Sequence, residues 1–257
     1  MRMPALFIGH GSPINALENN DFTRKWQELG AKLPKPKAIL SISAHWMTPG
    51  QGPFVSPQES PRMIYDFRGF PPELSEVSYP AAGSPELAQR ITELLPEATF
   101  NSDWGIDHGT WSVLVHLFPD ADIPVVQLSL DLDQPFTWHY ELGKKLAPLR
   151  DEGVLILGSG NVVHNLRKAN YDAPLPAYPW AKDLDRVIGG YVNENNHSAL
   201  VHISECAPDI VHLGIPTPDH YLPLLYVVAT QAPGEPTSFP VRGFSLKSLS
   251  MRSVQIG

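Results

Sequence analysis

The chain has 257 residues, enough for one large α/β domain or two small ones, and no segment has the composition of a linker. Its 19 basic and 27 acidic residues give a net charge of −8, which argues against a nucleic-acid partner because no basic excess is available to displace counterions from phosphates. The longest nearly continuous apolar stretch, 221–229, is far shorter than the roughly 20 residues of a membrane helix. With one cysteine, Cys206, and no charged-then-apolar leader, the sequence favours a cytoplasmic protein without internal disulfides or a membrane partner.

Strand and helix patterns alternate along the chain. Apolar, β-rich runs predict four buried strands, at 5–8, 38–44, 124–130 and 154–157. The spacing of apolar residues predicts helices over 20–33, 84–95, 111–118, 135–149, 180–193 and, after a turn, from 221 onward. The chain from 240 on is β-like, in short pieces. The alternation predicts an α/β fold, a single domain over residues 1–257 with a mostly parallel, mixed sheet flanked by helices on both faces.

A long segment after the second predicted strand has no regular pattern. Residues 47–85 contain eight prolines, and proline neither donates a backbone hydrogen bond nor fits inside a helix or a central strand. A long ordered loop in a compact domain is usually functional. Its aromatic residues, among them Tyr65, Phe67 and Phe70, either wall a pocket for an aromatic ligand or pin the loop to the core. Arg68 in the same loop is as well explained by a structural role as by a substrate contact.

Histidines provide the strongest functional signal. Five of the ten stand in predicted loops with glycine, proline or asparagine around them: His10, His45, His108, His164 and His220. His10 and His45 end predicted strands, and His164 follows a third strand within one turn of a predicted helix start. The carboxyl ends of parallel strands open onto one crevice, where ligands bind. We therefore expect these three side chains to meet.

The other five histidines have simpler interpretations. His116 and His139 lie inside predicted helices and are expected to serve in packing, and His197 and His202 are expected to be solvated. His212 follows an apolar pair, but nothing around it would organise a site.

A histidine cluster without thiolates indicates a particular class of metal. Imidazole suits iron(II), zinc, manganese or copper, whereas calcium and magnesium prefer oxygen ligands. The sequence has no HExxH helix and no glycine-rich phosphate loop. A serine nucleophile elbow at Ser12 is excluded because Pro13 removes the amide that would serve as the oxyanion donor.

Five motifs in the chain resemble those of a known enzyme family. They are GHGSP at 9–13, SAHW at 43–46, DHGTW at 107–111, GNVVHN at 160–165 and PTPDHYLP at 216–223. Together and in this order they resemble the class III extradiol ring-cleaving dioxygenases, and within that family the single-domain 4,5-DOPA extradiol branch. The resemblance runs from the first strand to the closing residues 248–257.

The resemblance implies a role for each motif histidine. His10 and His45 correspond to two metal ligands of the family, and His220 falls where this branch supplies the third. His164 corresponds to the acid/base beside the metal, which in metal-loaded resting forms is also a fourth ligand. His108 corresponds to a pocket histidine that contacts the substrate. The resemblance thus names His164 and His108 as catalytic residues.

The same resemblance implies the metal and the substrates. A catechol binds iron(II) after losing a proton, and a neutral histidine with a pKa of about 6.5 is suited to remove it. We expect iron(II) in the active enzyme, and a small L-DOPA-like aromatic diol, cleaved at the 4,5 position, and O2 as its substrates. Zinc(II) binds nitrogen sites more tightly, so it is expected in isolated protein, where it lacks redox chemistry. Tyr221 is a weaker candidate for substrate contact, and a homo-oligomer is left open.

Two functions from other classes remain open at this point. A zinc-dependent hydrolase would use a metal-bound hydroxide with His164 or His108 as proton shuttle, and would take up no oxygen. A non-enzymatic metal-binding relative on the same fold would tolerate replacement of the histidines. Fold alone does not separate these readings.

Overall fold

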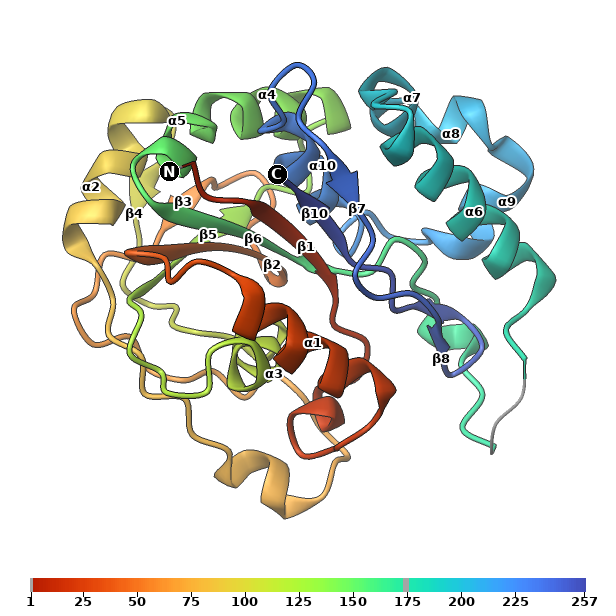
Figure 1. The fold of residues 1–257 in the computed structure, drawn as a ribbon, viewed down its shortest axis with the longest axis horizontal. Coiled ribbons are helices and arrows are strands. Elements are labelled where there is room, and N and C mark those ends of the chain that lie inside the picture. Colours follow the sequence, from red (N-terminus) through yellow and green to blue (C-terminus); the bar gives the residue numbers. More distant parts are fainter. Residues whose placement is uncertain (1, 173–175) are drawn as a thin grey trace.

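A mixed sheet of eight strands forms the centre of the structure, a computed structural model that describes residues 2–172 and 176–257 (Figure 1). Its order is β4-β3-β5-β2-β6-β1-β10-β7. The strands are β1 Ala5–Gly9, β2 Ala38–Met47, β3 Phe54–Val55, β4 Thr99–Phe100, β5 Val125–Leu130, β6 Val154–Gly160, β7 Thr237–Ser238 and β10 Val254–Ile256. The neighbours β5, β2, β6 and β1 are parallel, whereas β10 runs antiparallel to β1 and β3 antiparallel to β5. A separate hairpin pairs β8 Phe244–Ser245 with β9 Leu249–Ser250.

The central strands are covered on both faces. Every residue of β1, β5 and β6 is buried, which explains why these segments are continuous apolar runs in the sequence. Successive side chains of a strand point to opposite faces of the sheet. In β1, Leu6 and Ile8 accordingly join one hydrophobic core, and Ala5 and Phe7 join the other.

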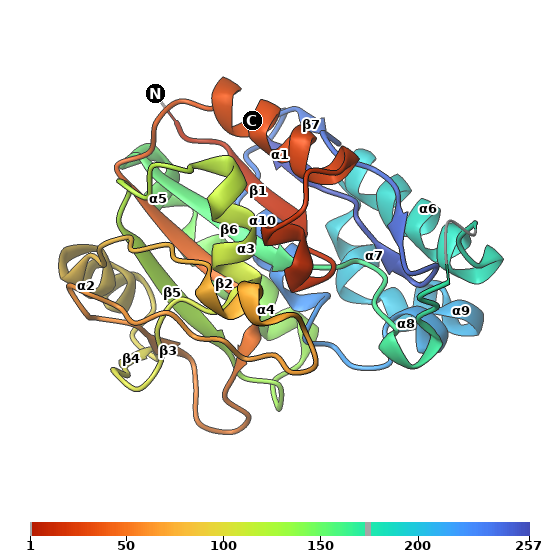
Figure 2. The same ribbon diagram turned by 90° about the horizontal axis from the view of Figure 1, so that it is seen from below.

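The helices divide between the two faces of the sheet (Figures 1 and 2). They are α1 Asp21–Lys32, α2 Pro85–Leu94, α3 His108–Leu117, α4 Phe136–Leu146, α5 Pro148–Asp151, α6 Pro179–Asn193, α7 His197–Val201, α8 Ile203–Cys206, α9 Pro208–Gly214 and α10 Leu222–Ala229. Short 3₁₀ helices lie at η1 Pro13–Ala16, η2 Pro72–Glu76 and η3 Leu166–Lys168. Helices α1 and α3 pack together on one face, while α10 and α4 pack on the other, and α6 lies at the β7 edge. The predicted fold class is confirmed.

Two helices differ from the prediction in their bounds. Helix α3 begins at His108 and not at Trp111, because the side chain of Asp107 caps it by accepting from the amide of Thr110 at 3.1 Å. The helix predicted over 135–149 is two helices, since Pro148 starts α5 and cannot continue α4.

Two further corrections concern predicted site residues. Strand β2 does not end at His45 but continues to Met47, with an irregular register against β5 between Ile42 and Met47. The helix expected to start within one turn of His164 is only the 3₁₀ turn η3, which begins at Leu166, and His164 itself forms an isolated bridge with Leu249. The segment 47–85, predicted as a loop, contains only β3 and η2 before α2.

None of the helices in the described residues 2–172 and 176–257 is long and apolar enough to span a membrane.

Candidate metal centre

Three of the motif histidines converge at one end of the sheet. His10 follows β1, His45 lies near the end of β2, and His220 lies in the turn before α10. One ring nitrogen from each lies within 4.8 Å of the other two, and the Nε2 atoms of His10 and His45 are 3.3 Å apart. His10 and His220 are buried and His45 is half-buried. The arrangement provides three imidazole donors around one point.

The outer nitrogen of each ring faces an oxygen atom. Ser159 Oγ donates to the Gly109 carbonyl, so its lone pair is free to accept from Nδ1 of His10 at 2.9 Å. Nδ1 of His220 donates to the Asp219 carboxylate. Nδ1 of His45 lies 3.2 Å from Oδ2 of Asp66. With the proton on Nδ1, each neutral ring keeps the lone pair on Nε2.

This tautomer pattern fits a bound cation. The Nε2 atoms of His10 and His45 face each other at 3.3 Å, a separation at which one cation can accept both lone pairs. Burial, reinforced by the neighbouring histidines, lowers the pKa of His10 and of His220 well below the usual range, so both rings stay neutral as metal ligands must be. Three imidazoles without a thiolate suit a non-haem transition metal.

Backbone contacts around Gly160 hold two of these segments together. The amide of His10 donates to the Gly160 carbonyl at 3.0 Å, and the amide of Asn161 donates to the His220 carbonyl at 2.9 Å. A Cβ atom on Gly160 would lie 2.2 Å from the carbonyl oxygen of His220. Glycine is therefore required where β6 passes between the two ligand segments.

Asp66 links the centre to His108. Its Oδ1 accepts from the backbone amide of His108 at 3.1 Å and also lies 2.9 Å from Nδ1 of that ring, although the ring N–H forms no aligned hydrogen bond. The rings of His108 and His45 are 3.8 Å apart between centroids. Burial acts to raise the pKa of Asp66, but its contacts with His108 and His45 hold it well below the usual range. One ionised carboxylate thus orients two histidines, a role that sequence reasoning missed; the only signal was the length of the loop that contains it.

His164 lies beside His220, and it is not among the residues that line the cavity described below. The two rings stack with centroids 3.4 Å apart and planes 5° apart. One ligand atom each from His164, Asp219 and His220 also lie within 4.8 Å of one another. Burial lowers the pKa of His164 to about 4, so the ring is a neutral proton acceptor near neutral pH.

A cavity of about 480 Å³ opens onto the three histidines. Its volume is within the range of small-molecule sites. The lining includes His10, His45, His108, His220, Asp66, Phe67, Arg68, Phe70, Leu166, Tyr171, Leu246 and Leu249. Phenylalanine, leucine and tyrosine residues thus share the walls with the histidines, Asp66 and Arg68, and such a lining is suited to a single aromatic ring with polar substituents.

Tyr221 does not line this cavity. Its side chain is fully buried, its hydroxyl donates to the Leu200 carbonyl at 2.9 Å, and its ring packs against Phe136 with centroids 5.6 Å apart. Tyr221 directly precedes α10, and its side chain lies in the hydrophobic core. The structure gives no support to the substrate contact suggested for it.

The remaining histidines stay outside the cluster. His139 is buried in packing, with Nε2 donating to the Asp131 carbonyl at 3.1 Å, and His202 and His212 are exposed. The expectation of a solvated His197 is wrong, because it is half-buried between the Tyr140 hydroxyl at 3.0 Å and Gln231 at 2.9 Å.

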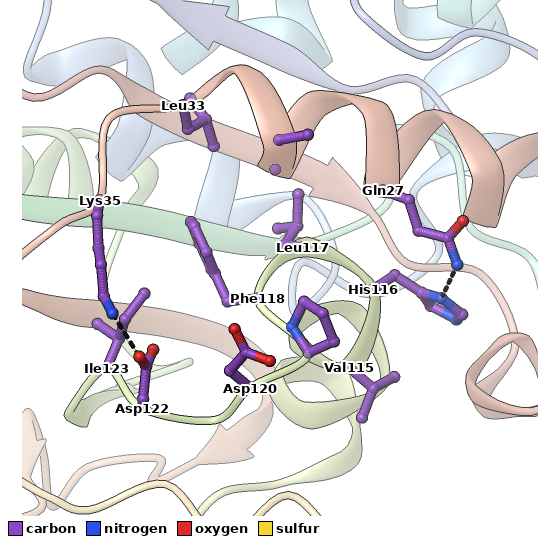
Figure 3. A pocket seen from close by; sticks show the side chains of 13 residues that line it. Gln27, Leu33, Lys35, Val115, His116, Leu117, Phe118, Asp120, Asp122 and Ile123 are labelled. Carbon is purple, nitrogen blue, oxygen red and sulfur yellow. Dashed lines mark hydrogen bonds and ion pairs between the residues drawn. The ribbon is translucent and has the colours of Figure 1, made fainter.

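A second cavity, of about 430 Å³, lies between α1 and the end of α3 (Figure 3). It contains an ion pair between Lys35 and Asp122 and a contact of 3.4 Å between Gln27 and His116. Nε2 of His116 donates to the Asn15 carbonyl at 2.8 Å, which accounts for this histidine as a packing residue. None of the five motif histidines lines this cavity, so the functional site is the one beside the metal centre.

Comparison with known proteins agrees with this geometry. Residues 4–212 match the family described as the catalytic LigB subunit of aromatic ring-opening dioxygenase, a range that ends before His220. A 4,5-DOPA dioxygenase extradiol of Escherichia coli (strain K12) is 49% identical over 100% of this chain and 95% of its own, and one of Beta vulgaris is 42% identical over 89% and 86%. A crystal structure of an uncharacterised protein from Escherichia coli K12 covers 100% of both chains with 46% identity and a TM-score of 0.87. The chain therefore belongs to the LigB family of aromatic ring-opening dioxygenases, extradiol enzymes that use a non-haem metal.

Proposed function

We propose that the chain, acting over residues 1–257 as one cytoplasmic catalytic domain, opens the ring of L-DOPA-like catechols by 4,5-extradiol cleavage with O2. The observation that carries this proposal is the convergence of His10, His45 and His220 beside a cavity of about 480 Å³. The substrate named for the two relatives, DOPA, supports the choice of catechol.

Iron(II), held by His10, His45 and His220, is the proposed metal. When bound, it supplies the redox chemistry between the aromatic ring and dioxygen that no side chain of the cluster has. Zinc(II) binds nitrogen sites more tightly than iron(II) and has no redox chemistry. We therefore expect isolated protein to contain zinc and to be inactive until iron(II) replaces the zinc.

Two histidines are proposed to move protons. His164 is neutral because burial lowers its pKa to about 4, and it takes the proton from a catechol hydroxyl. In the absence of substrate the same ring is proposed as a fourth ligand. His108 has Nδ1 against the ionised Asp66, which leaves its Nε2 to exchange a proton with the substrate.

Oxygen uptake tests the proposal. Protein reconstituted anaerobically with iron(II) receives L-DOPA, and oxygen consumption and product mass are read in one sample. We expect one O2 per catechol, a product heavier by both oxygen atoms, and turnover lowered at least a hundredfold in His164→Ala. The exposed His202→Ala is the matched control and keeps full activity. Absence of uptake with L-DOPA and with simple catechols, in protein whose iron content is one per chain, contradicts the proposal.

A further inference from the structure

We propose that Arg68 recognises a carboxylate on the side chain of the catechol and so determines which catechols are substrates. This inference rests on the proposed function, since it names the group that the cavity selects. It assigns to the segment 66–70 the role of a recognition wall. Arg68 is not one of the three proposed metal ligands, His10, His45 and His220.

Two residues of the segment 66–70, Asp66 and Phe67, contact the histidines of the metal centre. Asp66 contacts His45 and His108 through its carboxylate. The ring of Phe67 meets His108 edge-on with centroids 5.8 Å apart, and it meets Phe70 with centroids 5.5 Å apart. Arg68 therefore lies on a wall whose neighbours on either side are held in place.

The chain bends directly after Arg68, at Gly69 and Phe70. Gly69 has φ of +78°, a conformation that residues with a side chain rarely adopt. A Cβ atom at this position would meet no atom within 4 Å, so the glycine serves backbone conformation and not close packing. The bend leaves Arg68 and Phe70 lining the same cavity.

The charged residues that line the cavity favour an anionic group on the ligand. Among the residues of the described chain that line the cavity, Arg68 is the only lysine or arginine. The one carboxylate on the wall, Asp66, is already engaged with two histidines. None of the ion pairs and side-chain hydrogen bonds found among residues 2–172 and 176–257 involves Arg68. Its planar guanidinium group is thus available, and it can donate two parallel hydrogen bonds to a carboxylate.

The rest of the wall favours the ring of the same substrate. Phe67, Phe70, Leu166 and Leu249 supply apolar and aromatic surface. A catechol whose diol faces the histidines would place its ring against this surface and its side chain toward the guanidinium. The chemical class that fits is a catechol whose side chain carries a carboxylate, as that of L-DOPA does, in preference to a catechol without one.

Three catechols, with an anionic, a neutral and a cationic substituent on the ring, test the inference. They are 3-(3,4-dihydroxyphenyl)propanoate, 4-methylcatechol and dopamine, assayed with iron-loaded wild type and with Arg68→Gln. We expect kcat/KM for the propanoate to fall about ten- to a hundredfold in the variant, mainly through KM, while 4-methylcatechol changes less than twofold. Arg68→Glu reverses the order toward dopamine. The control is Arg62→Gln, an exposed arginine of the same loop that does not line the cavity.

Binding to the zinc-loaded protein gives a readout that does not depend on turnover. Titration calorimetry with the same three catechols is expected to show the preference for the propanoate in wild type and its loss in Arg68→Gln. If no catechol is turned over but this binding preference is found, the proposed function fails and the role of Arg68 stands. Turnover or binding that Arg68→Gln lowers equally for all three compounds, or for none, overturns the inference.

Discussion

The Nε2 atoms of His10 and His45 lie 3.3 Å apart, although 35 positions separate the two residues in the chain. Their outer nitrogens face Ser159 and Asp66, so both lone pairs point at the same place. A metal ion bound by both nitrogens would join the two segments that carry them. Four predictions follow from this arrangement and from the packing around it.

Metal should stabilise the folded chain. The ligand atoms are assembled only in the native state, so a metal that binds there raises the free energy of unfolding by about 4 kcal/mol at a free concentration a thousandfold above Kd. Thermal unfolding of metal-free protein with and without zinc(II) measures the effect, which should be on the order of 10 °C. His220→Gln should lose the shift, and His202→Gln should keep it. An equal shift in both variants would place the metal elsewhere.

Replacing Asp66 by asparagine should weaken the metal centre without unfolding the protein. The amide is nearly isosteric but cannot hold the same charge beside Nδ1 of His45 and His108. Loss of such an orienting carboxylate typically costs ten- to a hundredfold in metal affinity or activity, about the range expected here. Competition with a chromophoric chelator gives the affinity. Asp103→Asn, at an exposed position of a neighbouring loop, is the control that should leave it unchanged.

Gly160→Ala should damage the site through the backbone. The added methyl group would lie 2.2 Å from the His220 carbonyl, which must move and take the ring with it. We expect metal affinity to fall more than tenfold, and the free energy of unfolding to fall by about 1–3 kcal/mol. Gly190→Ala, inside α6 with no atom within 4 Å of the new Cβ, should instead stabilise the protein by about 0.5–1 kcal/mol. Chelator competition and denaturant unfolding distinguish the two variants.

His139 should make stability depend on pH. Burial lowers its pKa in the folded state to about 4, against about 6.5 in the unfolded chain. The unfolded state therefore binds more protons between these values, and the free energy of unfolding falls as pH decreases from about 6.5 to 4, by about 3 kcal/mol from this residue. Below the folded pKa this contribution is fully lost. Denaturant unfolding of metal-free protein across pH 4–8 should show a shallower slope for His139→Gln.

That comparison must separate protonation from hydrogen bonding. His139 also contacts the Tyr226 hydroxyl at 3.0 Å, so the variant loses stability even at pH 8, where the ring is neutral in both states. The difference between wild type and variant at pH 8 gives this constant loss. A wild-type slope that persists unchanged in the variant would assign the pH dependence to other groups.

The sequence predicted the four central parallel strands and most of the longer helices because their patterns are local. The apolar runs of β1 and β6 and the cap at Ser84 before α2 are determined by neighbouring residues, and the structure agrees with each. The approach of His10 and His45 was also expected, since parallel strand ends share one edge of a sheet. These inferences needed only the order of elements.

What the sequence did not predict depends on contacts between distant segments. Ser159 becomes the acceptor for His10 only because β1 and β6 pair in register, with Ile8 opposite Ser159. Asp66 contacts His45 only because of the path that an irregular loop takes. The spacing of apolar residues in the sequence does not predict such a path. The helix expected to start near His164 is only the turn η3, and the isolated bridge between His164 and Leu249 joins segments far apart in the chain, so no local pattern indicates it.

The three nitrogen donors come from the first strand, the second strand and the turn before α10, so the last of them is made late in translation. Ribosome-bound chains that end before His220 contain the GHGSP and SAHW motifs but only two thirds of the donor set. Such nascent chains would bind a divalent ion weakly and in open geometry. The full donor set would therefore form only after the turn before α10 has folded against β1 and β2.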